Sequence, residues 1–172
     1  MGQNISSKQR CIDKPPQNTN WAGDKNTMND DDNYNYKKYE LLPSPITVNG
    51  YTAYKIRALK SFGNVAKGET GGAVSSEANL SHFGCCWIYD DGVVVGNAKV
   101  YGNAKVYDNA VIAENAQVYD CAKVGGNSTV RGNAQIYDCA RVLENAVVDG
   151  DSKIRGLMRV YGDSNVNDEN WE

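Results

Sequence analysis

Two sets of side chains in this sequence carry chemistry: one histidine close to two cysteines, and a periodic series of cations and tyrosines. The histidine, His82, lies in LSHFGCCW together with Cys85 and Cys86. A histidine can serve as the general base of an acyl transfer, and a neighbouring thiol can serve as a nucleophile. Either role requires a cleft and an orienting group, which these neighbours do not indicate. We therefore interpret the segment as part of a packed cap with inert, buried thiols.

The cysteine and histidine counts argue against a metal or cofactor site. None of the five cysteines has the CxxC spacing of a zinc or redox motif. A single histidine cannot supply a three-histidine zinc site within one chain. No cofactor and no metal is predicted. An odd number of cysteines without a signal peptide fits free thiols in a reducing compartment.

The second set recurs every 18 residues. A column of cations at sheet spacing, bordered by tyrosines, can hold phosphates and stack bases. The alternative is that these are ordinary solvent-facing strand residues, offset by acids at the turns. A net charge of −3 and a pI near 5.2 argue against nucleic acid as the partner and leave a small nucleotide open. The candidate ligand-binding residues are Lys105, Lys123, Arg141, Arg159, Tyr101, Tyr119 and Tyr137.

The spacing of these side chains comes from a six-residue repeat over residues 88–167. Every sixth residue from Ile88 to Val166 is valine or isoleucine. A small residue follows four positions later, with Met158 as the one large exception before the pattern ends at Asn170. Pairs such as Gly-Asn and Asp-Asn between them tolerate the positive φ of tight turns. Each β-branched residue then points inward, and the small residue fits the bend. Three edges make an 18-residue triangular coil, and between four and five coils stack into a parallel β-helix.

These residues resemble the left-handed parallel β-helix of the hexapeptide-repeat proteins, and the left hand is implied by that resemblance alone. Residues 56–91 resemble the cap that precedes such repeats in uncharacterised bacterial and prophage proteins. Some of those proteins are labelled acetyltransferases because of their fold. The family's acyltransferases use a histidine base near a subunit boundary, which would make His82 the candidate here. Trimers are usual in the family.

The outward faces of the repeat differ in character. One face carries aliphatic side chains in register, which implies a covering surface. A homotrimer interface is the first interpretation, and packing of the cap or the arm over this face is the second. Cys121 and Cys139 are predicted to stack at one corner of adjacent coils, where both a disulfide and two parallel thiols are sterically possible. The candidate interface residues are Val93, Val95, Val111, Ala113, Thr129 and Val147.

The chain divides into four regions. Residues 1–44 form a polar arm, which we expect to dock onto its own body, neighbouring subunits, or other virion or host proteins. Residues 45–87 form a small β cap, with a hairpin turn predicted at Asn49-Gly50. The β-helix follows over 88–167, and 168–172 are a short tail.

We expect a non-enzymatic phage or prophage scaffold that assembles as a homotrimer. Two other hypotheses stay open: a phage protein that sequesters a small anionic ligand such as a host nucleotide signal, and a hexapeptide-type acyltransferase. No apolar run approaches the length of a membrane span, and no signal peptide opens the sequence. The expected location is the host cytoplasm or the virion, with no membrane partner.

Overall fold

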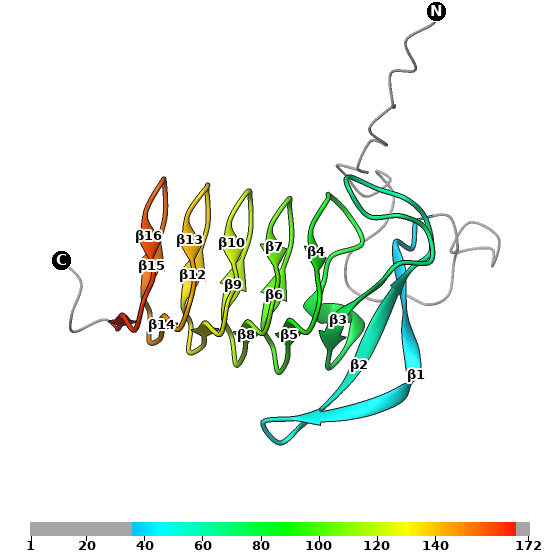
Figure 1. Ribbon diagram of the computed structural model, residues 1–172, viewed down its shortest axis with the longest axis horizontal. Coiled ribbons are helices and arrows are strands. Elements are labelled where there is room, and N and C mark those ends of the chain that lie inside the picture. Colours follow the sequence, from blue (N-terminus) through cyan, green and yellow to red (C-terminus); the bar gives the residue numbers. More distant parts are fainter. Residues whose placement is uncertain (1–35, 168–172) are drawn as a thin grey trace, which may run out of the picture.

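The structure is a computed structural model that describes residues 36–167, and these form an all-β solenoid preceded by a small β cap (Figure 1). The solenoid makes about five turns. Each full turn adds one short strand to each of three stacked sheets, which confirms the predicted fold of stacked β coils. The described elements are β1 (Tyr39–Val48), β2 (Tyr51–Ala58), β3 (Thr70–Val74), the 3₁₀ helix η1 (Glu77–Asn79), β4 (Trp87–Ile88), β5 (Val93–Val94), β6 (Lys99–Val100), β7 (Lys105–Val106), β8 (Val111–Ile112), β9 (Gln117–Val118), β10 (Lys123–Val124), β11 (Thr129–Val130), β12 (Gln135–Ile136), β13 (Arg141–Val142), β14 (Val147–Val148), β15 (Lys153–Ile154), β16 (Arg159–Val160) and β17 (Asn165–Val166).

The three sheets run along the length of the solenoid. The eight-stranded sheet has the order β1-β2-β3-β5-β8-β11-β14-β17, the five-stranded sheet β16-β13-β10-β7-β4, and the four-stranded sheet β15-β12-β9-β6. Within the solenoid all pairs are parallel and in register, as Val124 opposite both Val106 and Val142 shows. Residues 18 positions apart therefore form straight columns along the axis. This register positions every candidate functional side chain.

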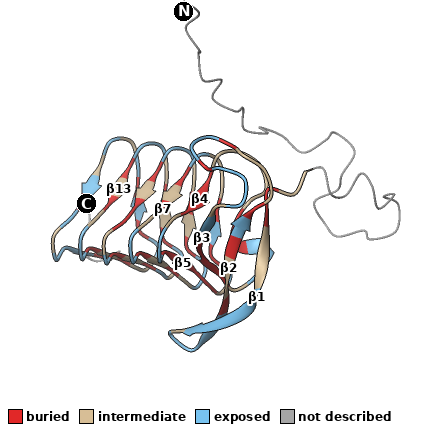
Figure 2. Cartoon of the chain, turned by 45° about the vertical axis from the view of Figure 1, so that its right-hand side comes forward, coloured by how far each residue is buried: buried red, intermediate tan, exposed pale blue. Residues whose placement is uncertain are grey.

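The core is the inward column of valine and isoleucine from each sheet (Figure 2). Val118, Val124 and Val130, one from each side of a single coil, are completely buried. The alanines at the bends, such as Ala122, are also completely buried. Burying each such valine stabilises the fold by about 1.5–3 kcal/mol. No single coil has a core of its own, so the stability arises from stacking.

The corners are fastened by side chains that reach the next coil. Asp138 adopts a positive φ of 54°, and its carboxylate accepts a hydrogen bond from the Gly156 amide at 2.9 Å. Glu144, with a φ of 62°, accepts in the same way from the Gly162 amide at 2.9 Å. Acidic residues therefore occupy left-handed positions, and hydrogen bonding to the adjacent coil offsets the conformational cost.

Met158 interrupts the column of small bend residues because of its position in the stack. Its equivalents one and two coils earlier, Ala140 and Ala122, are completely buried between neighbouring coils. Met158 lies in the last described coil, where it is only partly buried and packs against the edge of the core. A large side chain is tolerated at this end because no further described coil stacks on it.

The cap is a long, bent hairpin of β1 and β2 that extends the eight-stranded sheet through β3. The predicted turn at Asn49-Gly50 is confirmed, with φ values of 50° and 81°. β1 begins at Tyr39, so the hairpin starts upstream of residue 45, where the cap was expected to begin. Figure 1 shows the hairpin tip projecting away from the body of the solenoid. Of the predicted arm, residues 1–35 lie outside the described residues, as does the tail 168–172.

Candidate functional site

The predicted basic column lies on the outer face of the five-stranded sheet. Lys105 pairs with Lys123, Lys123 with Arg141, and Arg141 with Arg159 in successive strands. None of the ion pairs among residues 36–167 involves these four side chains. Lys105 Nζ lies 5.7 Å from the centroid of the Tyr89 ring, a cation–π contact. Like charges in neighbouring strands repel, so this column reduces stability unless an anion neutralises it.

The predicted tyrosine column lies on the outer face of the four-stranded sheet. The Tyr101 and Tyr119 ring centroids are 4.8 Å apart, and those of Tyr119 and Tyr137 are 5.1 Å apart, with interplanar angles of 2° in both pairs. The Tyr101 hydroxyl donates to Gln117 Oε1 at 3.1 Å. Burial, as the largest cause, raises the pKa of Tyr101 and Tyr119.

This stacking limits what the tyrosines can bind. Each ring face inside the column is already covered by the next tyrosine, so a nucleobase could stack only on an end ring or contact the ring edges. The tyrosine and basic columns also lie on different sheets, which meet at the corner formed by residues 102–104. The tyrosines that share the outer face of the five-stranded sheet with the cations are instead Tyr89, Tyr107 and Tyr161. The candidate ligand-binding residues therefore form two surfaces on either side of one corner, as their positions in the six-residue repeat predict.

The predicted apolar interface lies on the outer face of the eight-stranded sheet. At its cap end, Val93 and Val95 are buried in a small cluster with Ala53 and Ala73, against which Ala113 packs. Because Ala53 belongs to β2, the cap hairpin covers this end of the face within the same chain.

Beyond the hairpin the face stays partly open. Val111, Thr129 and Val147 form an in-register column that is only half buried, which we call the apolar strip. Beside it, Arg131 Nε donates to Asp149 Oδ2 at 2.7 Å, which limits the strip on one side. The interpretation that the cap packs over this face is confirmed at the cap end, and the homotrimer interface stays a prediction for the apolar strip.

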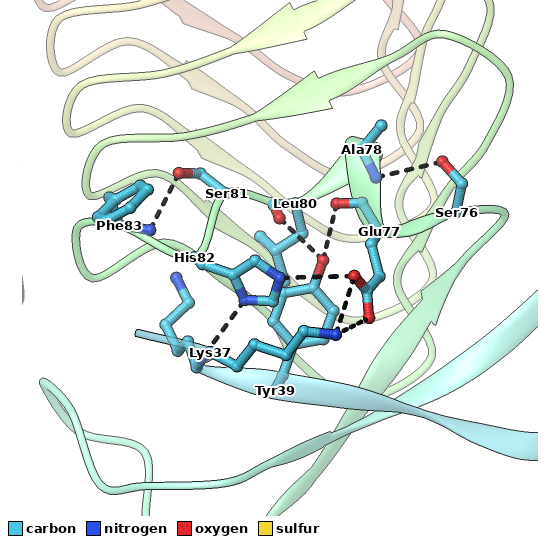
Figure 3. A network of polar contacts seen from close by, with 10 residues as sticks. Lys37, Tyr39, Ser76, Glu77, Ala78, Leu80, Ser81, His82 and Phe83 are labelled. Atoms are coloured by element: carbon cyan, nitrogen blue, oxygen red, sulfur yellow. Dashed lines mark hydrogen bonds and ion pairs between the residues drawn. The ribbon is translucent and has the colours of Figure 1, made fainter. Parts of the chain in front are cut away.

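His82 is packed into the cap rather than presented to a substrate (Figure 3). Its side chain is 13% exposed, and its ring stacks on Tyr39 with centroids 4.4 Å apart. Nδ1 accepts a hydrogen bond from the Lys38 amide at 3.2 Å, so the proton is on Nε2. Nε2 is buried without a hydrogen-bond partner and lies 3.9 Å from Glu77 Oε2. Burial, as the largest cause, lowers the pKa of His82 to about 4.

The carboxylate beside His82 was not anticipated from the sequence. Glu77 is held by the Lys37 ammonium at 2.9 Å, and its backbone carbonyl accepts from the Tyr39 hydroxyl at 3.0 Å. An open pocket of about 480 Å³ adjoins this network. It is lined by Glu77, Ala78 and residues 80–84 of the cap together with residues 99–102 and Gln117. His82 borders the pocket, but its acceptor nitrogen is engaged by the backbone. This arrangement does not present a general base.

A buried lysine lies on the other side of the same cap. Lys38 is 1% exposed, and its Nζ donates to the Cys86 carbonyl at 2.8 Å and contacts Cys86 Sγ at 3.2 Å. Nζ also lies 4.9 Å from the centroid of the Phe62 ring. Burial lowers the pKa of Lys38 and raises the pKa of the Cys86 thiol. The prediction that Cys86 is a buried thiol is confirmed, and its raised pKa disfavours the reactive thiolate.

The other cysteines differ from one another. Cys121 and Cys139 are free and exposed. Cys85 is disulfide-bonded, which corrects the expectation of a free thiol at this position. Among the described residues, no group of three or more histidine, cysteine, aspartate or glutamate side chains could hold a metal ion.

In the comparisons with known proteins, no family model matches the chain, and no curated protein matches it. No helix among residues 36–167 has the length and apolar character needed to span a membrane.

Proposed function

We propose that this chain is a non-enzymatic scaffold of a phage or prophage that self-associates as a homotrimer. The proposal includes the left hand of the hexapeptide-repeat solenoids, and an arm, residues 1–44, that docks onto neighbouring subunits. The chain itself offers a rigid stack of coils with straight columns of side chains, which suits a structural role. His82 has its acceptor nitrogen occupied and a pKa lowered to about 4 by burial, so it gives the acyltransferase hypothesis no support.

The observation that carries the proposal is the apolar strip. Val111, Thr129 and Val147 continue the line of Val93, which is buried beneath the chain's own hairpin. One part of a single apolar column is thus covered within the chain, and the rest is left half exposed. An in-register apolar surface of this kind is typical of an interface between protein chains.

The hairpin supplies the complementary surface. Its tip is largely exposed (Figure 2). Two large apolar side chains near the tip are exposed, Ile46 at 36% and Tyr51 at 37%. In the proposed assembly, the hairpin tip of one subunit packs on the apolar strip of the next. Each subunit both offers and receives the contact, so the rotation can close into a ring of three.

Sedimentation equilibrium of the purified full chain tests this proposal. We expect a trimer for the wild type and dissociation for Val147→Glu, because a carboxylate placed in an apolar contact loses its hydration without a partner. Gln135→Glu is the matched control, since Gln135 holds the same half-buried position before an inward residue on the four-stranded sheet. A wild type that sediments as a monomer at all concentrations contradicts the proposal.

A second candidate function, binding of a small anion such as a nucleotide, is favoured by the basic column alone. Four cations in register without an ion pair among the described residues are costly, and an anionic ligand would remove that cost. Titration calorimetry against a panel of nucleotides tests it with Lys123→Glu/Arg141→Glu. Lys153→Glu, on the four-stranded sheet, is the control. Identical isotherms for the wild type and the double variant remove this candidate.

A further inference from the structure

One corner of the solenoid departs from the pattern of the other two. At the corner that follows the eight-stranded sheet, Asn97 donates to Asn115 at 3.2 Å, Asn115 to Asn133 at 3.1 Å, and Asn133 to Asp151 at 2.8 Å. The corner that follows the five-stranded sheet carries an equivalent ladder, with distances of 3.1, 3.2 and 2.9 Å, through Asn109, Asn127, Asn145 and Asp163.

The third corner, between the tyrosine and basic columns, carries no such ladder of side-chain hydrogen bonds among the described residues. Asn103 accepts a hydrogen bond from the Cys85 amide at 3.2 Å, but the next two positions of this column are Cys121 and Cys139. Each could have been an asparagine, as in every equivalent coil at the other corners. A position that departs from the asparagine pattern without a gain in packing or hydrogen bonding indicates a functional role. Packing does not explain the cysteines, since both side chains are exposed.

The solenoid holds these two thiols next to each other. The backbone amide of Cys121 donates to the Asp138 carbonyl at 2.8 Å, so the two coils are hydrogen-bonded at this point. Burial, as the largest cause, and then the neighbouring Cys139 raise the pKa of the Cys121 thiol. Two residues earlier in each coil, the Tyr119 and Tyr137 rings lie parallel and 5.1 Å apart, which measures the spacing between the coils here. A separation of about 5 Å lies within the Cα range of about 4.4–6.8 Å found for disulfides.

We propose that Cys121 and Cys139 form an oxidisable dithiol site, which closes into an intrachain disulfide on exchange with a small disulfide such as oxidised glutathione. One thiol loses its proton and attacks a glutathione sulfur, and the first glutathione leaves as a thiolate. The second cysteine then attacks the mixed disulfide, the Sγ–Sγ bond forms, and the second glutathione leaves. The two cysteines lose two hydrogens in total, and one oxidised glutathione becomes two reduced ones.

The same geometry makes the bond readily reversible. Side chains in a parallel column keep their Cβ atoms about one coil spacing apart, whereas disulfides prefer about 3.5–4.5 Å. Closing the bond therefore pulls the two coils together at this corner, and strained disulfides are the ones that thiols reduce easily. We expect a dithiol that responds to the thiol–disulfide balance, in contrast to a permanent structural bridge.

Tryptic mapping of the full chain tests this proposal directly. Cleavage after lysine and arginine places Cys121 in peptide 106–123 and Cys139 in peptide 132–141, with 124–131 between them. After incubation with oxidised glutathione, acid quenching and alkylation, we expect these peptides as a linked pair, two hydrogen atoms lighter than their sum. The linked pair should be about ten times as abundant as the glutathione adducts, or more, since the second thiol is present at an effective concentration of about millimolar or above.

Two variants make the outcome decisive. Cys121→Ser and Cys139→Ser remove one exposed thiol each, and each should accumulate glutathione on the remaining cysteine. Non-reducing electrophoresis should show the wild-type linked pair within one chain, and reduced glutathione in excess should open it. Glutathione adducts on both wild-type cysteines without the linked pair, or a link between two chains, would overturn the proposal.

Discussion

The buried imidazole of His82 makes the stability of the cap depend on pH in a way that can be calculated. The pKa of His82 is lowered from 6.5 to about 4 in the folded chain, chiefly by burial. Between these values the unfolded chain takes up a proton that the folded chain does not. The contribution to the free energy of unfolding is therefore complete above pH 6.5, and it is lost as the pH falls towards 4.

The magnitude follows from the size of the pKa change. A difference between 6.5 and about 4, at about 1.36 kcal/mol per pH unit, gives a loss of about 3 kcal/mol between pH 7 and pH 4. Solvent screening reduces this free-energy contribution little, because the His82 side chain is only 13% exposed. Such a loss is a large fraction of the stability of a typical domain, which is about 5–15 kcal/mol.

The matched variant is His82→Asn. An asparagine oxygen near the position of Nδ1 can accept the hydrogen bond from the Lys38 amide, but asparagine does not titrate. The variant loses the ring contact with Tyr39, and this cost is the same at every pH. Urea unfolding at several values between pH 4 and pH 7 should therefore show a steeper loss for the wild type, by about 3 kcal/mol across the range.

Two results would refute this reasoning. Parallel pH profiles for the wild type and His82→Asn would show that the histidine does not contribute to the linkage. Because His82 is the one histidine in the sequence, its imidazole signals in an NMR titration need no assignment. A midpoint near 6.5 in the folded protein would show that the ring is not buried as described.

Two further predictions concern the corners of the solenoid. Gly126 has a φ of +72°, and an added Cβ would lie 2.6 Å from the Glu144 amide nitrogen. Gly126→Ala should therefore lower the free energy of unfolding by more than about 2 kcal/mol. Gly156 has a φ of +62° with open space around it, so Gly156→Ala should lower it by about 1 kcal/mol. Thermal unfolding of both variants checks this, and equal losses would show that close approach between coils is not limiting. Replacing Cys121 and Cys139 together by asparagine should complete the third ladder and raise the free energy of unfolding by up to about 1 kcal/mol. A destabilised double variant would show that the thiols have a structural role.

Several features of the site could be predicted because the repeat is strictly periodic. Once the 18-residue period is known, Lys123 must lie beside Arg141, and Tyr119 beside Tyr137, whatever the rest of the chain does. What the period could not show is that the tyrosine rings stack face to face, since that depends on side-chain rotation. The same period places the tyrosines and the cations on different faces of the repeat, and the structure has them on two different sheets.

The contacts of the cap could not be predicted from the sequence, because the cap is not part of the repeat. Lys38 contacts His82 and Cys86 across sequence separations of 44 and 48 residues, and no repeat relates these positions. The sequence predicted a packed His82, but it did not reveal that Glu77 faces the ring or that a lysine is buried against the thiol. Contacts of this kind depend on how the β1–β2 hairpin folds back, which is a property of the whole structure.

The sequence by itself determined the stacked coils, because every sixth residue must be small enough and apolar enough to fill a triangular core, and stacking is the one way to bury that column. Only the tertiary structure decided which outward surfaces are open. The bent hairpin buries Val93 and Val95 and leaves Val111, Thr129 and Val147 half exposed, although all five read alike in the sequence. The difference is one of position along the axis, because the hairpin extends over the first coils only and does not cover the outer face of the later ones.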